Sequence, residues 1–270
     1  IDNTGAIVAT RVPSLAAVEL DDINGIQGRY GVPLTWGNLE FAAFNLVRKQ
    51  YTEFAPELLP PNPPDIDLPP TRVSTSFFFQ GQVPDGIVQG TPLVFYNTDY
   101  RYTYGTDVWG SEIWFTSNSA KIHGEGFHWY PTYGVQYFNV EEFLHQRGVF
   151  TDPFGAVNTT VINSNTDNDI FGPGIGIKGE LEHRWFSASV EPRIMFGIND
   201  FSARVLTNNL RGPGDPVTIT EIKETKFVPV FQFNAMLKVP VGERLNLRFG
   251  YQYYYFPDVA RAGEAIFYNE

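Results

Sequence analysis

Apolar and polar residues alternate with a period of two along most of the chain, which is the pattern of half-buried β-strands. The clearest case lies near the C-terminal end, where Leu247, Phe249 and Tyr251 alternate with Arg248 and Gly250. The same alternation predicts eight strands, at about residues 23–34, 39–50, 106–117, 121–143, 169–182, 186–198, 226–239 and 244–256. The expected fold class is therefore all-β and antiparallel.

The polar face of these strands distinguishes two all-β architectures. In a soluble β-sandwich this face would look out to water and favour Thr, Lys and Glu. Here it is rich in glycine and mixes Arg with Glu, as where Gly174 and Gly176 precede Lys178 and Glu180. Small residues beside long charged ones suit the crowded interior of a barrel. We therefore favour a barrel and keep the sandwich as an alternative.

Short and long connections alternate along the chain. Short turns are expected at 35–38, 117–120, 183–185 and 240–243, and long irregular segments at 51–105, 148–168 and 199–225. Outer-membrane barrels have this rhythm because their periplasmic turns are tight and their external loops are long. The pattern predicts a single transmembrane β-barrel domain over residues 1–270, with the three long segments outside.

The order of the connections also bears on the number of strands. The first connection is short, although it should be a long external loop if both termini were periplasmic. One more strand at each end would restore the usual order and give ten, with Gly5–Thr10 and Glu264–Tyr268 as candidates. The strand-like segments Val73–Gln80 and Thr91–Asn97 form either a loop hairpin or a further pair, so that eight to twelve strands are possible. The closing strands could instead lie outside this sequence or in another chain.

Composition agrees with a membrane barrel and argues against several other classes. Aromatic residues make up 16% and charged residues 18% of the chain. No stretch approaches 18 consecutive apolar residues, so no membrane-spanning helix is expected. The net charge of −11 argues against a nucleic-acid partner. The absence of cysteine excludes disulfides and thiolate chemistry, and no cofactor is expected.

A set of charged residues is predicted to point into the barrel. By alternation, the inward residues are Arg29, Glu40, Glu112, Lys178, Glu180, Glu191, Arg193, Lys238 and Arg248. Most lie a few residues from a short turn, so they should share the periplasmic half of the lumen. Charges in a narrow space must be paired, since an unpaired one costs several kcal/mol. We expect ion pairs that plug the lumen, with a narrow ion pathway lined by the same residues as the alternative.

Aromatic residues near strand ends are candidates for the girdle at the membrane surface. They are Trp36, Trp185, Tyr251, Tyr253 and Tyr255. The segment Asn163, Asn165, Asp167, Asp169 has oxygen side chains at every second residue, as calcium loops do, but lacks the glycine and the terminal glutamate of such loops. It is a weak calcium candidate beside the simpler interpretation as a solvated loop. No residue context marks a nucleophile, so no enzymatic activity is expected.

Three segments resemble a known family. Along the chain they are an aromatic strand, a hairpin, and a strand followed by an arginine-containing loop. Their residues are Tyr133–Glu142, Asp169–Gly176 with Trp185–Val190, and Leu247–Glu264. They are similar to the planctomycete β-barrel porin-like outer-membrane family, and the resemblance covers about residues 23–50 and 106–264. It implies an outer-membrane barrel of roughly ten strands without catalytic residues. The chain differs from the family at both ends, where family members have an aromatic first strand and a last strand ending in Phe.

These observations give three functional hypotheses. The first is a structural or surface-scaffold barrel, embedded in outer-membrane lipid, whose long loops contact other envelope proteins or copies of itself. The second is a passive porin-like channel for ions or small solutes. The third is a soluble β-sandwich that binds carbohydrate through exposed Trp and Tyr.

Overall fold

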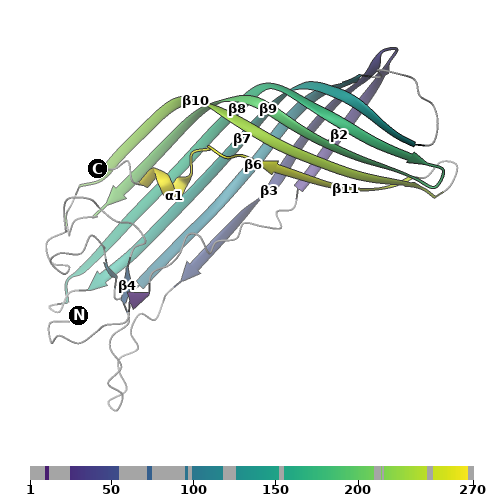
Figure 1. Ribbon diagram of the computed structural model, residues 1–270. Helices are drawn as coiled ribbons and strands as arrows, with labels where there is room; N and C mark the ends of the chain where they lie inside the picture. The colour runs from purple at the N-terminus through teal and green to yellow at the C-terminus, as the bar shows by residue number, and fades with distance from the viewer. Residues whose placement is uncertain are drawn as a thin grey trace.

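The computed structural model describes residues 10–11, 25–54, 72–74, 95–96, 99–117, 126–151, 155–209, 214, 216–241 and 246–266. Eight long strands form one antiparallel sheet in the order β11-β10-β9-β8-β7-β6-β3-β2 (Figure 1). Their bounds are β2 Gly25–Leu34, β3 Gly37–Phe54, β6 Asp99–Ser117, β7 Gly126–Thr151, β8 Val157–His183, β9 Phe186–Asn208, β10 Thr218–Pro240 and β11 Asn246–Tyr255. The all-β, antiparallel prediction is confirmed.

The strands are longer than the sequence predicts at the end away from the tight turns. The ranges 148–168 and 199–225, expected as irregular loops, are mostly strand, since β8 begins at Val157 and β9 ends at Asn208. The expectation was wrong for a different reason on each strand. On β9 the apolar residues Phe201, Ala203 and Val205 lie on the inner face, opposite in phase to the apolar belt, whereas on β8 most residues on both faces of the extension are polar. On β8, for instance, Ser164 and Thr166 are buried on the inner face while Asn165 is exposed on the outer one. Hydrophobic alternation therefore fades on β8 although the strand continues.

A second, small sheet lies outside the main one. It contains β1 (Thr10–Arg11), β4 (Arg72–Ser74) and β5 (Phe95–Tyr96), with β1 parallel to β4 and β4 antiparallel to β5. The pairing of β4 with β5 fits the loop-hairpin alternative for the segments 73–80 and 91–97, not further barrel strands. Thr10, in the candidate strand Gly5–Thr10, pairs with β4 and not with the main sheet; the rest of that candidate lies outside the described residues.

The candidate strand Glu264–Tyr268 is wrong over its described part. Residues Ala262–Ala265 form the short helix α1, and Ile266 caps it. Ala262 and Ala265 are both buried, and their spacing of three matches one face of a helix, not of a strand. No described strand joins the two edges of the main sheet, β2 and β11, so the sheet is not closed. The ten-strand count stays a prediction.

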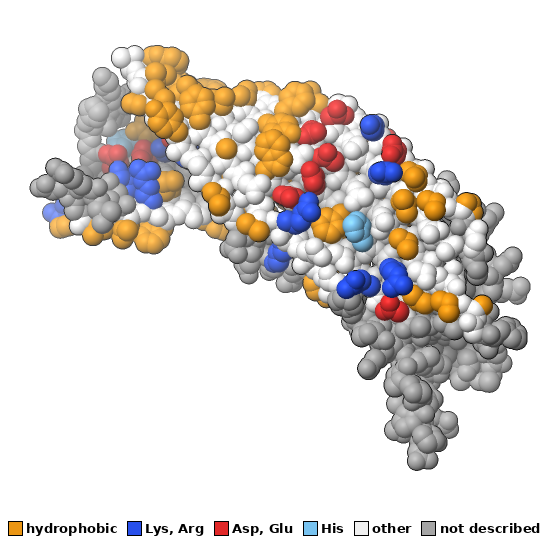
Figure 2. Space-filling model, turned by 180° about the vertical axis from the view of Figure 1, so that it is seen from behind, with side chains coloured by type: hydrophobic (Ala, Val, Ile, Leu, Met, Phe, Trp, Pro, Cys, Tyr) orange, Lys and Arg blue, Asp and Glu red, His pale blue; other side chains and the backbone are white. Residues whose placement is uncertain are grey.

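The outer face of the sheet carries a continuous apolar belt. Every outward residue is apolar or glycine over residues 127–137 of β7, 171–181 of β8, 188–198 of β9 and 227–237 of β10. Each stretch has the length of a membrane-spanning strand, about 9–11 residues. In Figure 2, most charged side chains on this face lie beyond the belt, toward the end away from the turns. Among the described residues, no helix is long and apolar enough to cross a membrane.

The inner face is packed. Its apolar cluster is centred on Phe44, Phe138, Ile170, Met195, Val228, Val230 and Val259. The first six come from five different strands, whereas Val259 follows β11 in the chain. The sheet therefore curves around its own side chains and a segment of its C-terminal region, as a barrel wall does around its contents.

Candidate functional site

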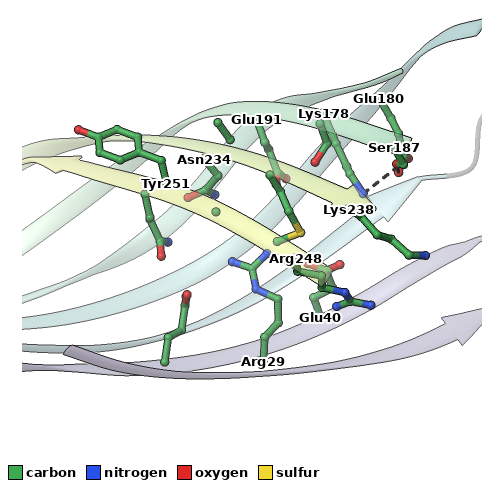
Figure 3. Close-up of a pocket in the computed structure, with 16 residues that line it drawn as sticks. Arg29, Glu40, Lys178, Glu180, Ser187, Glu191, Asn234, Lys238, Arg248 and Tyr251 are labelled. Carbon is green, nitrogen blue, oxygen red and sulfur yellow. Dashed lines mark hydrogen bonds and ion pairs between the residues drawn. The ribbon is translucent and has the colours of Figure 1, made fainter. Parts of the chain in front are cut away.

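A polar cavity of about 340 Å³ occupies the end of the inner face next to the tight turns. Seven of the nine residues predicted to point inward line it, namely Arg29, Glu40, Lys178, Glu180, Glu191, Lys238 and Arg248 (Figure 3). They come from β2, β3, β8, β9, β10 and β11. Alternation places each of them inward, and the closeness of the turns gathers them at one end of the sheet.

The remaining two predicted residues, Glu112 and Arg193, lie deeper and are almost fully buried, at 3% and 4% exposure. The Arg193 guanidinium donates to Glu112 Oε2 at 3.3 Å and lies 2.7 Å from Glu191. Arg29 reaches both Glu112 and Glu40, at 3.6 Å each. The buried charges thus form one connected network that links the cavity to the centre of the inner face.

Glu112 is the hub of this network. Its Oε2 accepts hydrogen bonds from Trp114 Nε1 at 3.0 Å, from Gln136 Nε2 at 2.9 Å and from Gln232 Nε2 at 3.3 Å, besides the one from Arg193. Such multiple partners offset the cost of removing a carboxylate from water. Because the donors lie on β6, β7, β9 and β10, one carboxylate ties together strands on opposite sides of the curved sheet.

Trp114 packs against the network and contacts the Arg193 guanidinium with its ring. The Arg193 guanidinium lies 4.1 Å from the centre of the Trp114 ring, which is a cation–π contact. Glycines make room for this indole, since a Cβ on Gly134 would lie 2.6 Å from Trp114 Cδ2 and one on Gly174 would lie 2.8 Å from its Cη2. The sequence predicts an inner face rich in glycine, and at these two positions glycine is needed because any larger side chain would clash with Trp114.

The sequence interpretation missed Trp114, Gln136 and Gln232. All three lie at inward positions of the alternation, so extending the inward set to uncharged polar and aromatic residues would have found them. Next to these residues on the inner face, the Tyr254 ring packs against those of Phe44 and Phe138, with ring centres 5.1 and 5.3 Å apart. An aromatic layer therefore follows the charged one along the inner face.

The segment after β11 turns back onto the inner face, and this too was missed. Asn168 accepts a hydrogen bond from the Ala260 N–H at 2.8 Å and donates one to the Ala260 carbonyl at 3.0 Å. Ser164 donates to the Ala262 carbonyl at 2.6 Å. Figure 1 shows α1 lying on this side of the sheet, away from the turns. Residues 257–266 therefore occupy part of the inner face beyond the side chains of the strands, beside a cavity of about 570 Å³.

An ion pair fastens this segment. Arg261 bonds the buried carboxylate of Glu142, which also accepts from the Ala262 N–H at 3.3 Å. Burial lowers the pKa of the Arg261 guanidinium, but the neighbouring Glu142 outweighs it, so that the net pKa is raised. Burial, and then the same carboxylate, raise the pKa of Tyr104 nearby. Arg261 therefore stays charged and Tyr104 neutral.

The comparison with known families agrees with this architecture. The family model described as "Putative beta barrel porin-7 (BBP7)" matches residues 105–269, which is more than half of the chain. The chain belongs to the BBP7 family. The search of curated proteins finds no match. The resemblance to a porin-like barrel family is thus confirmed, whereas the planctomycete origin stays a prediction.

Membership of BBP7 and the single continuous sheet both disagree with the soluble sandwich. A sandwich needs two sheets packed face to face. The long strands of this BBP7 chain form one sheet, and the only other described sheet is the small one of β1, β4 and β5.

The calcium candidate of this BBP7 chain does not form a loop. Asn163, Asn165, Asp167 and Asp169 lie on strand β8. Extended backbone spreads these four residues over roughly 20 Å, too far for all of them to share one ion that binds its oxygens at about 2.3–2.6 Å. Asp167 and Asp169 instead accept hydrogen bonds from Asn139, at 2.7 and 3.1 Å. Among the described residues, no group of three or more His, Cys, Asp or Glu could hold a metal ion.

The five girdle candidates are all exposed. Trp36 lies in the turn between β2 and β3, and Trp185 in the turn between β8 and β9, so both are at the turn end of the sheet. Tyr251, Tyr253 and Tyr255 follow one another along the outer face of β11 instead of sharing one level. Whether these residues meet the membrane surface stays a prediction.

Proposed function

We propose that the chain is an integral outer-membrane β-barrel protein with a structural or surface-scaffold role and a largely closed lumen. The observation that carries this proposal is the buried Glu112–Arg193 network, with donors from four strands. A solute passing through would have to separate buried ion pairs and leave charges unpaired, at a cost of about 3–5 kcal/mol. The C-terminal segment 257–266 supports the proposal by occupying part of the inner face beyond that network.

Conductance in planar lipid bilayers tests the closed lumen. We expect no stable unitary currents from the protein, because the network and the C-terminal segment lie in series on the inner face. Stable unitary currents that change when Arg193 is replaced by Ala would contradict the proposal. They would favour the alternative, a narrow passive channel for ions or small solutes lined by the same charges.

The proposal places the chain in the outer membrane. Membership of a porin family suggests this location, and the apolar belt gives a surface that lipid would cover. Its partners would be outer-membrane lipid and other envelope proteins or copies of itself, with no catalytic activity. A nucleic-acid partner is not proposed, given the net charge of −11.

Membrane insertion has its own test. A folded barrel in detergent is expected to migrate differently from the boiled protein on a gel, and to fractionate with the outer membrane. A chain that stays monomeric and folded without detergent would contradict the proposed location.

A further inference from the structure

Two cations in the turn-side cavity lie side by side on neighbouring strands. Lys238 on β10 and Arg248 on β11 are directly opposite in the antiparallel register, and both line the cavity. Like charges placed opposite each other on neighbouring strands repel. Within the described part of the chain, neither side chain makes an ion pair or a hydrogen bond.

The acids of the cavity are already engaged elsewhere. Glu40 lies 3.6 Å from Arg29, Glu180 lies 3.7 Å from Lys178, and Glu191 lies 2.7 Å from Arg193. The residues that line the cavity therefore carry four positive and three negative charges, a net charge of +1, although the chain as a whole has a net charge of −11.

A third donor in the same cavity also lacks an acceptor. Asn234 lies two inward positions along β10 from Lys238 and lines the cavity. Its amide Nδ2 is buried and has no hydrogen-bond acceptor among the described residues, and a buried unsatisfied donor costs free energy. The cavity thus holds a buried donor without an acceptor close to two neighbouring cations.

We propose that this cavity binds a small oxyanion, a carboxylate or a phosphate, with Lys238 and Arg248 as its ligands. The planar guanidinium of Arg248 can hold two oxygens of such a group side by side, and the Lys238 ammonium adds a point charge. Figure 3 shows Lys238 and Arg248 on neighbouring strands of this cavity. Arg248 is exposed and Lys238 partly so, so a water-borne anion reaches both.

Calorimetric titration of the purified protein in an uncharged detergent tests the site. Inorganic phosphate and acetate are titrated separately, at constant ionic strength set with sodium chloride. We expect saturable binding of at least one of them, and the stronger of the two identifies the preferred class of anion. In the double variant Lys238→Gln with Arg248→Gln, we expect the affinity to fall about tenfold or more, because charge-assisted hydrogen bonds are lost.

The matched control removes two cations that lie outside the cavity. Arg147→Gln with Arg204→Gln changes the net charge equally, at exposed positions on β7 and β9, and should leave the affinity unchanged. This control also separates specific binding from the general stabilisation that phosphate gives to folded proteins. Absence of saturable binding by both anions, or equal affinity in the Lys238/Arg248 double variant, would overturn the proposal.

Thermal unfolding in chloride alone gives a second, independent readout. Without the anion, the Lys238/Arg248 double variant should unfold at the same temperature as the native chain or at a higher one, because the repulsion is relieved. A lower unfolding temperature would mean that the two cations are already neutralised within the protein, which would also overturn the proposal. Neither readout depends on whether the lumen conducts.

Discussion

At the scale of single residues, Glu112 connects the strands of the inner face through its hydrogen bonds and ion pairs. It is a buried carboxylate whose partners come from strands that are far apart in sequence; Arg193 is 81 positions away. Removing one member of a buried ion network leaves an uncompensated charge, which costs more than the intact network contributes. The network is therefore a source of strong energetic coupling between strands.

A double-mutant cycle measures this coupling. Glu112→Gln should lower the free energy of unfolding by up to about 3–5 kcal/mol, because Arg193 then keeps only Glu191 as an acidic partner. The double variant with Arg193→Gln should lose clearly less than the sum of the single variants. Urea unfolding in lipid vesicles gives the free energies. The exposed pair Arg204–Glu221 is the control, with a coupling of about 0–1 kcal/mol; additive losses at Glu112 and Arg193 would contradict the account.

On the outer face beyond the apolar belt, Glu141 gives a pH-dependent prediction. Partial burial, and then the carboxylates of Asp167 and Asp107, raise its pKa, and Arg48 only partly opposes them. A raised acid pKa stabilises the folded state at low pH, and this contribution is lost as the pH rises through the folded pKa. Glu141→Gln should therefore raise the unfolding temperature at pH 7, and the gain should vanish below about pH 4.

The control for this prediction is Glu221→Gln, which removes a carboxylate 3.3 Å from Arg204. It should not raise the unfolding temperature at pH 7. If Glu141→Gln destabilised the protein at neutral pH as much as this control, the ion pair with Arg48 would outweigh the acidic neighbours, and the sign argued above would be wrong.

Part of the arrangement of these buried residues can be predicted from the sequence. Alternation alone is enough to assign Glu112 and Arg193 to the inner face, because side chains on a strand point to opposite faces in turn. It cannot say that the two meet, since strand tilt and register decide which inward rows approach one another across the curved sheet. Asn234 and Gln232, neighbours in the same inward row, illustrate this: one lacks an acceptor for its amide, while the other joins the network.

At the scale of elements, the C-terminal segment is the least expected feature. Glu264–Tyr268 was the candidate for a further strand of the wall, but the described part of the segment lies against the wall, with a short helix at Ala262–Ala265. The segment is too short and too weakly patterned for alternation to separate strand from helix. What fixes it is a set of polar residues on the inner face of β7 and β8, including Glu142, Ser164 and Asn168. Those partners are distant in sequence and have no local signature.

Asn168→Ala tests how the segment is held. The change leaves the Ala260 N–H and carbonyl without partners, each at about 1–3 kcal/mol. Amide hydrogen exchange over residues 258–266 should become faster, with little change in the central strands. Asn165→Ala on the outer face of the same strand is the control and should leave that exchange unchanged. Equal exchange in both variants would show that the segment is held by other contacts.

The strands are also longer than the alternation of apolar and polar residues predicts. The four central stretches of the belt were readable because their outward residues are Phe, Ile, Val and similar side chains. Beyond Phe171 on β8 and Ile198 on β9, the outward residues become Asp169 and Asp200, which pair with each other in the register. On β8 the inner residues are mostly polar as well, so the hydrophobic period fades. On β9 the apolar residues Phe201, Ala203 and Val205 lie on the inner face, so the alternation continues with its phase reversed.

At the scale of the whole molecule, the outer face divides into two zones. The apolar belt lies next to the tight turns, and acidic residues such as Asp107, Asp167 and Asp200 follow beyond it on β6, β8 and β9. Figure 2 shows charged side chains on this face beyond the belt. This division and the family membership are the observations that support the proposed membrane barrel. They do not show that the wall closes, because β2 and β11 each have a strand on one side only among the described residues.

Single-cysteine labelling tests the central claim most directly, since the chain has no cysteine of its own. The test compares Asp169→Cys with Phe171→Cys, two positions apart on the outer face of β8, and with Trp185→Cys in the turn. In intact Gram-negative cells, a membrane-impermeant maleimide should label position 169 but not 171, and should label position 185 only after the outer membrane is opened. Labelling of positions 169 and 171 to the same extent, or of 185 in intact cells, would contradict a barrel that spans the outer membrane with its tight turns inside.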